Sequence, residues 1–163
     1  MSRQKALPDD LRQLCIQLVR GYDRRVKDYY DLRREIIDGT TTPYVTIKDP
    51  GDPDNWKNTE WAYQPKAHNA SRTTEGIAER LLALENLPDT KYMRAVEQAQ
   101  LRVGLDLPEE LRRKLVKAIM LNCSAGRRYP FECLDVEGIE RTNFYSRRTE
   151  FLIDIANYLD FKI

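Results

Sequence analysis

Apolar side chains recur every three or four residues along the first part of the chain. The stripe consists of Leu11, Leu14, Leu18, Tyr22, Val26, Tyr29, Leu32 and Ile36. This spacing places them on one face of an α-helix, which we expect to end at Asp38-Gly39. A helix of about 29 residues is roughly 43 Å long. One short neighbour cannot cover such a face, so we expect residues 1–38 to form a homodimer.

Proline and glycine are concentrated in the segment that follows, and they predict an irregular insert over residues 39–72. Within it, residues 44–47 are a candidate short strand. A connection of about 30 residues is too long for an ordinary loop, so the insert is either disordered or functional. Trp56 and Trp61 are the two tryptophans of the chain. They either anchor the insert to the helices or form a docking patch for a partner.

Helical periodicity returns after the insert. Residues 73–104 predict a helical middle, with one helix from about 73 to 87 and another from about 90 to 103. A fourth helix is expected to end near residue 122. Asp106 and Glu109 have the spacing of a capping box at its start.

The order of elements in residues 105–163 predicts a helix-turn-helix domain. After the fourth helix come a loop, a short helix over residues 131–137, a turn at Gly138-Ile139 and a long last helix over residues 140–161. The expected core of this domain is Leu115, Ile119, Cys133, Leu134, Ile139 and Phe144. The predicted fold is therefore all-α: a long N-terminal helix with an irregular insert, a helical middle and a C-terminal helix-turn-helix.

A helix-turn-helix reads DNA with the N-terminal half of its second helix and holds phosphates with flanking basic residues. The candidate base-reading residues are Arg141, Thr142, Asn143 and Ser146. The candidate phosphate-binding residues are Arg127, Arg128, Arg147 and Arg148. Residues 124–149 nevertheless contain five arginines and four acids, a net charge of only +1. Acids near a duplex repel its phosphates. The alternative is that Arg141, Arg147 and Arg148 form an ordinary solvated surface.

Composition argues against several other classes of protein. The chain has a formal net charge of +1, three scattered cysteines and a single histidine, His68. We find no nucleophile–base set, phosphate loop or metal-ligand cluster, so we expect no enzymatic activity, metal or cofactor. No apolar run approaches 18 residues and the N-terminus lacks a signal sequence, which predicts a soluble cytoplasmic protein without a membrane partner.

The C-terminal sequence carries a family resemblance. Residues 139–153 read Ile-Glu-Arg-Thr-Asn-Phe-Tyr-Ser-Arg-Arg-Thr-Glu-Phe-Leu-Ile, and residues 158–161 close with Tyr-Leu-Asp-Phe. This pattern resembles the C-terminal signature of phage late-gene activators of the ArpU/RinA type. The segment from Arg72 to Leu84 is similar to the helix that follows the variable insert of that family. Glu140 and Asn143 depart from the family pattern, which has Ser and Thr at those places.

The resemblance implies a DNA-binding domain similar to region four of sigma factors. The expected function is a sequence-specific DNA-binding transcription regulator of phage or prophage origin. Its partners would be double-stranded DNA, a second copy of the chain and, as a further candidate, RNA polymerase. The alternative is a non-enzymatic helical protein that mediates protein–protein interaction or assembly, which the near-neutral charge favours.

Overall fold

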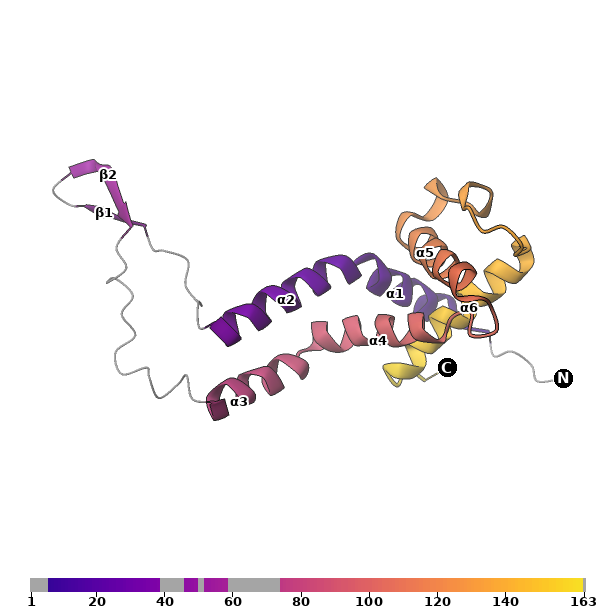
Figure 1. Ribbon diagram of the computed structural model, residues 1–163, viewed down its shortest axis with the longest axis horizontal. Coiled ribbons are helices and arrows are strands. Elements are labelled where there is room, and N and C mark those ends of the chain that lie inside the picture. The colour runs from indigo at the N-terminus through magenta and orange to yellow at the C-terminus, as the bar shows by residue number, and fades with distance from the viewer. Residues whose placement is uncertain (1–5, 39–45, 50–51, 59–73, 163) are drawn as a thin grey trace. The chain divides into compact units, whose positions relative to one another are not determined.

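The computed structural model describes residues 6–38, 46–49, 52–58 and 74–162, and the regular secondary structure in these ranges is helical except for one hairpin (Figure 1). The predicted all-α class is confirmed. The helices are α1 (Asp9–Arg20), α2 (Tyr22–Asp38), α3 (Thr74–Glu85), α4 (Pro88–Arg102), α5 (Glu109–Ala125) and α6 (Arg141–Tyr158). Two 3-10 turns, η3 (Gly126–Arg128) and η4 (Phe131–Cys133), lie between α5 and α6.

The N-terminal helical segment is divided at Gly21 into α1 and α2 rather than continuous. The Gly21 N–H still donates to the Gln17 carbonyl at 3.1 Å. The Arg25 guanidinium lies against Gly21 and donates from Nη1 to the Leu18 carbonyl at 2.9 Å. A Cβ at residue 21 would stand 2.6 Å from that Nη1 atom. Glycine therefore lets the arginine reach the end of α1.

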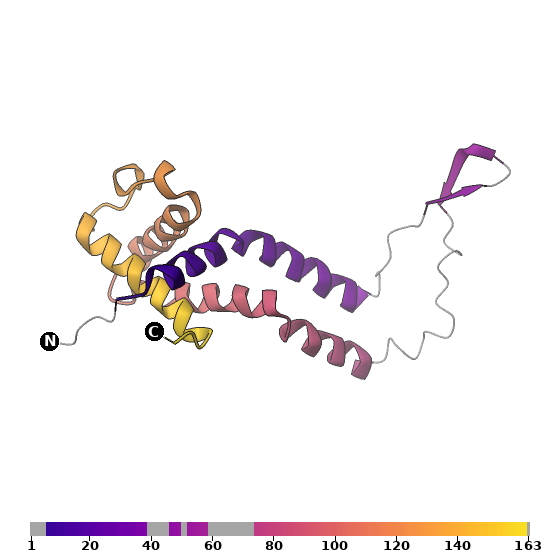
Figure 2. The same cartoon turned by 180° about the vertical axis from the view of Figure 1, so that it is seen from behind.

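The chain forms two compact units, one made of residues 1–27 with 87–163 and the other of residues 28–86. In the first unit α4 packs on α6, and α1 packs on α5 and α6, as the two opposite views show (Figures 1 and 2). Large side chains with less than 2% of their surface exposed fill its centre, among them Phe144, Phe151, Met93, Leu115, Ile119, Leu152 and Ile155. These side chains form the core on which α6 rests.

Several sequence predictions about helix ends and buried faces are wrong in detail. The helix predicted from about residue 90 is α4, and it begins already at Pro88, where the missing N–H of proline costs nothing. Leu14, predicted to face inward, is 42% exposed. Cys133, predicted in the core of the helix-turn-helix, is exposed. Besides the predicted Leu18, α1 buries Cys15, Ile16 and Val19, so its inward face is rotated from the predicted stripe.

The second unit contains most of α2, the hairpin and α3. Tyr29 and Leu84 are buried, and the Tyr29 hydroxyl donates to a carboxylate oxygen of Glu85. Strands β1 (Thr46–Asp49) and β2 (Asp52–Asn58) pair antiparallel with an irregularity after Lys48. The described part of the insert, residues 46–49 and 52–58, is thus more regular than the sequence predicts. Trp61 and the side chain of Trp56 lie outside the described part of the chain. Whether they anchor the insert to the helices or form a docking patch for a partner therefore stays open.

The described part of the chain contains neither a candidate membrane span nor a candidate metal site. None of the helices there combines the length and the apolar character that crossing a bilayer requires. In the same ranges, no three His, Cys, Asp or Glu side chains come together in an arrangement that could hold a metal ion.

Candidate nucleic-acid interface

The N-terminal turn of α6 presents polar side chains to solvent. Arg141, Thr142 and Asn143 are consecutive and all exposed, whereas Phe144 beside them is completely buried. The Phe144 ring lies 5.3 Å from the rings of Phe131 and Tyr145, measured between centroids. One face of this helix therefore anchors it in the core while its first turn projects outward. Ser146, the fourth predicted base-reading residue, is half-buried.

The segment before α6 is tighter than predicted. The sequence predicts two helical turns over residues 131–137, but the structure has the single 3-10 turn η4 and then non-helical backbone. Successive short-range bonds shape it: Val136 N–H donates to Leu134 O at 3.0 Å and Ile139 N–H to Val136 O at 3.4 Å. These turns place Val136 and Ile139 in the core, so apolar burial takes precedence over helix continuation here.

A turn between α4 and α5 brings an acid to α6. Gly104 has a φ of +64°, a left-handed conformation that suits glycine. Arg112 of α5 holds the end of α4 by donating to Val103 O at 2.9 Å and to Leu101 O at 2.6 Å. The predicted capping box is wrong, because α5 has no side-chain cap. Asp106 is directed instead to Arg147 of α6.

The ion pair between Asp106 and Arg147 is bidentate. Arg147 donates from Nη1 to Asp106 Oδ1 at 2.8 Å and from Nη2 to Asp106 Oδ2 at 2.6 Å. These bonds lower the pKa of the Asp106 carboxyl to about 2 and raise the pKa of Arg147. A third bond runs from Arg147 Nε to Asn143 Oδ1 at 2.6 Å. A predicted phosphate-binding residue and a predicted base-reading residue are therefore joined to each other.

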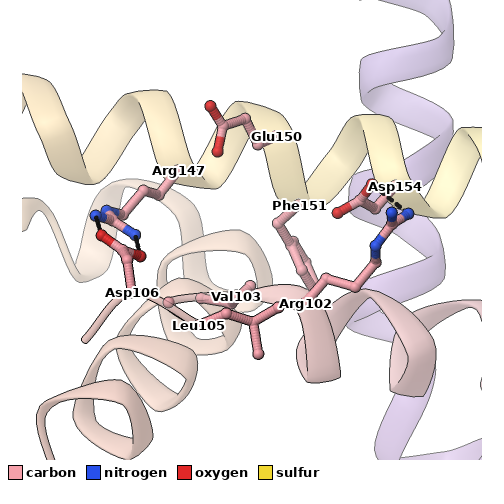
Figure 3. A pocket seen from close by; sticks show the side chains of 9 residues that line it. Arg102, Val103, Leu105, Asp106, Arg147, Glu150, Phe151 and Asp154 are labelled. Atoms are coloured by element: carbon pink, nitrogen blue, oxygen red, sulfur yellow. Dashed lines mark hydrogen bonds and ion pairs between the residues drawn. The ribbon is translucent and has the colours of Figure 1, made fainter. Parts of the chain in front are cut away.

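The pair lies at one end of a cavity of about 200 Å³ between the α4–α5 turn and α6. Figure 3 shows Asp106 and Arg147 at this end and a second pair, Arg102 and Asp154, at the other. The second pair is a single contact of 3.2 Å. Burial raises the pKa of Asp154, and the charge of Arg102 opposes that rise.

Arg141 is also engaged, although more loosely. Its guanidinium is 3.0 Å from a carboxylate oxygen of Glu132, and both side chains are more than half exposed. It also lies over the Tyr145 ring, 5.9 Å from the centroid. An exposed pair of this kind is worth about 0–1 kcal/mol, so a phosphate or a base edge can displace Glu132.

The remaining predicted phosphate-binding arginines differ in their settings. Arg128 is exposed on η3, and the side chain of Arg127 lies outside the described part of the chain. Arg148 is half-buried, and its Nε is buried without a hydrogen-bond partner among the described residues. Burial raises the pKa of the Cys123 thiol, and the positive charge of Arg148 opposes this. Arg148 is thus directed toward the interior beside Cys123.

Sequence reasoning missed the two acids that contact the candidate interface. Asp106 and Glu132 lie 41 and nine positions from their arginine partners. The surplus of acids in residues 131–140 could have indicated that one of them, such as Glu132, pairs with an arginine of the interface, because ordered arginines need counter-charges. For Asp106 the sequence offered only a local role as a helix cap.

Comparison of the chain with protein-family models, with curated proteins and with solved structures gave no match.

Proposed function

We propose that this protein is a sequence-specific DNA-binding transcription regulator and that the first turn of α6 enters the major groove. The observation that carries the proposal is the exposure of Arg141, Thr142 and Asn143 beside the completely buried Phe144. A rigid helix end with polar side chains is the element that helix-turn-helix proteins place against base edges. The resemblance of residues 139–153 to phage late-gene activators supports the same function, and with it a phage or prophage origin and a cytoplasmic site of action.

Each predicted contact then has a chemical role. Arg141 can donate two hydrogen bonds to guanine, and Thr142, Asn143 and Ser146 can bond to other base edges. Arg127 and Arg128 precede the helix and would contact phosphates on either side of the groove. Phosphate contacts of this kind fix the orientation of the protein and make binding depend on salt.

Self-association is part of the proposal. The α2 portion of the second unit exposes Tyr30, Leu32 and Ile37 at 52%, 41% and 44%. A second copy that covers these side chains would make a homodimer, and a dimer would bind two half-sites spaced by whole turns of DNA. Light scattering at tens of micromolar protein should show the dimer mass, and a monomer at that concentration would contradict it. RNA polymerase remains a candidate further partner.

Selection of bound duplexes from a random DNA pool at low salt tests the main proposal. We expect one enriched motif. Asn143→Ala should weaken binding to that motif by about 1–3 kcal/mol and relax the preference at one base pair. Asn157→Ala is the matched control, because Asn157 is an exposed asparagine at the other end of α6. If both variants bind every sequence as the unmodified protein does, α6 does not read DNA.

A second candidate function is protein–protein interaction. Leu101 and Leu105 are 59% and 70% exposed, and two of the predicted DNA-contacting arginines already pair with acids. These observations favour a helical assembly protein. Absence of any enriched DNA motif, together with weaker self-association or partner binding in Leu105→Ser, would support this alternative over DNA binding.

A further inference from the structure

We propose that three arginines at the last turn of α5 form a phosphate-binding site: Arg20 of α1, Arg128 of η3 and Arg148 of α6. Arg128 and Arg148 are already candidate phosphate contacts of the helix-turn-helix, whereas Arg20 belongs to the first helix of the chain. The inference extends the phosphate contacts of the proposed function to α1. It depends on a bound phosphate group and not on base reading by α6.

The first step is the pairing of the other arginines. Every arginine of α4, α5 and α6 except Arg148 forms an ion pair, with a carboxylate oxygen 2.6–3.6 Å from its guanidinium. In the part of the chain that the structure describes, no carboxylate forms an ion pair with Arg20, Arg128 or Arg148. The described residues therefore supply these three arginines with no counter-charge.

The second step is that the same three arginines converge. Gly126 begins η3 directly after α5, and Arg128 ends it. Nη2 of Arg20 lies 3.7 Å from the position that a Cβ at Gly126 would take. Burial raises the pKa of the Cys123 thiol in the last turn of α5, and the charges of Arg148 and Arg20 both oppose that rise. Since α1 packs on α5 and α6 within one compact unit, the three side chains surround one helix end.

A helix end attracts positive charge by itself, but these side chains do not cap α5. Arg112 shows what such a cap looks like, because it donates to the Val103 carbonyl at the end of α4 at 2.9 Å. Among the described residues, no carbonyl accepts a hydrogen bond from Arg20 or Arg148, and Nε of Arg148 is buried without a partner. Their charge is therefore not used to hold the helix end.

A phosphate group matches this arrangement. Guanidinium groups form charge-assisted hydrogen bonds with phosphate oxygens, often two at a time. Like charges that lie close together repel one another, so an anion bound between them stabilises the protein. Arg20 and Arg128 are exposed and Arg148 is half-buried, which leaves the cluster accessible from solvent. The DNA backbone and a free phosphate ion offer the same chemistry, and the experiment distinguishes these two sources.

Titration with inorganic phosphate tests the site. We expect the Nε–H signals of Arg20 and Arg148 in NMR spectra to shift and to saturate at about millimolar phosphate, as befits so small a ligand. The Nε–H signal of Arg113, which pairs with Glu109, should not move. Sodium chloride keeps the ionic strength constant, so that general screening is the same throughout the titration. Equal shifts of the Arg20 and Arg113 signals would overturn the inference.

Arg20→Gln is the decisive variant, because Arg20 is exposed at the end of α1. It should weaken phosphate binding about tenfold through the loss of one charge-assisted hydrogen bond. Arg113→Gln is the matched control, since it removes the same charge from another exposed arginine, and it should bind phosphate as the unmodified protein does. Circular dichroism checks that both variants are folded. Equal phosphate affinities of the two variants would overturn the site.

The salt dependence of binding to a DNA duplex identifies the source of the phosphate. If the ligand is the DNA backbone, Arg20→Gln should flatten the slope of log K against log salt by about one unit, and Arg113→Gln should not. An unchanged slope in Arg20→Gln, together with weaker binding of inorganic phosphate, assigns the site to a free phosphate group. Absence of DNA binding contradicts the proposed function alone. An unchanged phosphate affinity of Arg20→Gln contradicts this inference alone.

Discussion

The side-chain amide of Asn122 donates a hydrogen bond from Nδ2 to the carbonyl oxygen of Tyr129, at 2.8 Å. Asn122 is 5% exposed in the last turns of α5, and Tyr129 follows η3. This bond fixes the loop that carries Arg127 and Arg128. Asn122→Ala should lower the free energy of unfolding by about 1–3 kcal/mol, because the Tyr129 carbonyl loses its partner. Urea unfolding followed by circular dichroism measures the change.

Gln98→Ala is the control for Asn122→Ala. Gln98 is exposed in α4, so its removal should change stability by no more than about 0.5 kcal/mol. Equal stabilities of the two variants would show that the buried amide contributes nothing to the loop.

The pKa values of the two aspartates at the ends of the cavity, Asp106 and Asp154, should be shifted in opposite directions. Hydrogen bonds from Arg147 lower the pKa of Asp106 from its ordinary 3.8 to about 2, whereas burial raises the pKa of Asp154 above 3.8. The Asp106 pair therefore stabilises the fold above about pH 4 and loses its contribution as the pH falls from about 4 to 2. Carboxyl ¹³C chemical shifts in a pH titration give both midpoints. Midpoints in the reverse order would contradict the assigned contacts.

The sequence predicted the local features of the fold best. Leu115, Ile119 and Phe144 are predicted by their spacing in the core of the C-terminal domain, and all three are completely buried. Helical periodicity is a local property, so it can be read without knowing what packs on the helix. The same reasoning misplaced Leu14, because apolar residues flank the true inner face of α1 and only tertiary packing decides which of them is buried.

The candidate site was predicted less completely. Periodicity and residue type identified Arg141, Thr142 and Asn143 as an exposed helix end, and each is exposed. The pairing of Asp106 with Arg147 could not be predicted, because it joins residues 41 positions apart. An aspartate at position 106 is also what a capping box with Glu109 would need, so the sequence pattern fits both roles. Sequence pattern could not choose between a contact along one helix and a contact with another.

Thiol reactivity should distinguish the three cysteines. Cys15 and Cys123 are 0% and 1% exposed, and burial raises the pKa of Cys15 to about 11. Cys133 is exposed. Because the thiolate is the reactive form, a maleimide at neutral pH should modify Cys133 quickly and the other two only on unfolding. Cys133→Ser should remove the fast phase. Fast labelling of two or more sites in the native protein would show that α1 and α5 do not pack as described.

Glycine is required at the turn that carries Asp106. Gly104 has a φ of +64°, and a Cβ there would meet Arg112 Cγ at 3.3 Å and side-chain atoms of Leu107 and Leu115 at 3.4 Å. Gly104→Ala should therefore lower the free energy of unfolding by about 1–2 kcal/mol through the strain of an alanine in the left-handed conformation. The added methyl group should also displace packed neighbours. Gly138→Ala is the matched comparison, since Gly138 has a φ of +88° but nothing within 4 Å of the added carbon.

Urea unfolding of the two alanine variants isolates the packing contribution. We expect Gly104→Ala to lose more stability than Gly138→Ala, because both backbones are left-handed but only the Gly104 site is crowded. A turn displaced at Gly104 also moves Asp106, so the pKa of that carboxyl should rise back toward 3.8 in Gly104→Ala and stay near 2 in Gly138→Ala. Equal stabilities, together with an unchanged Asp106 midpoint, would mean that the α4–α5 turn tolerates a side chain and does not depend on glycine to bring Asp106 to Arg147.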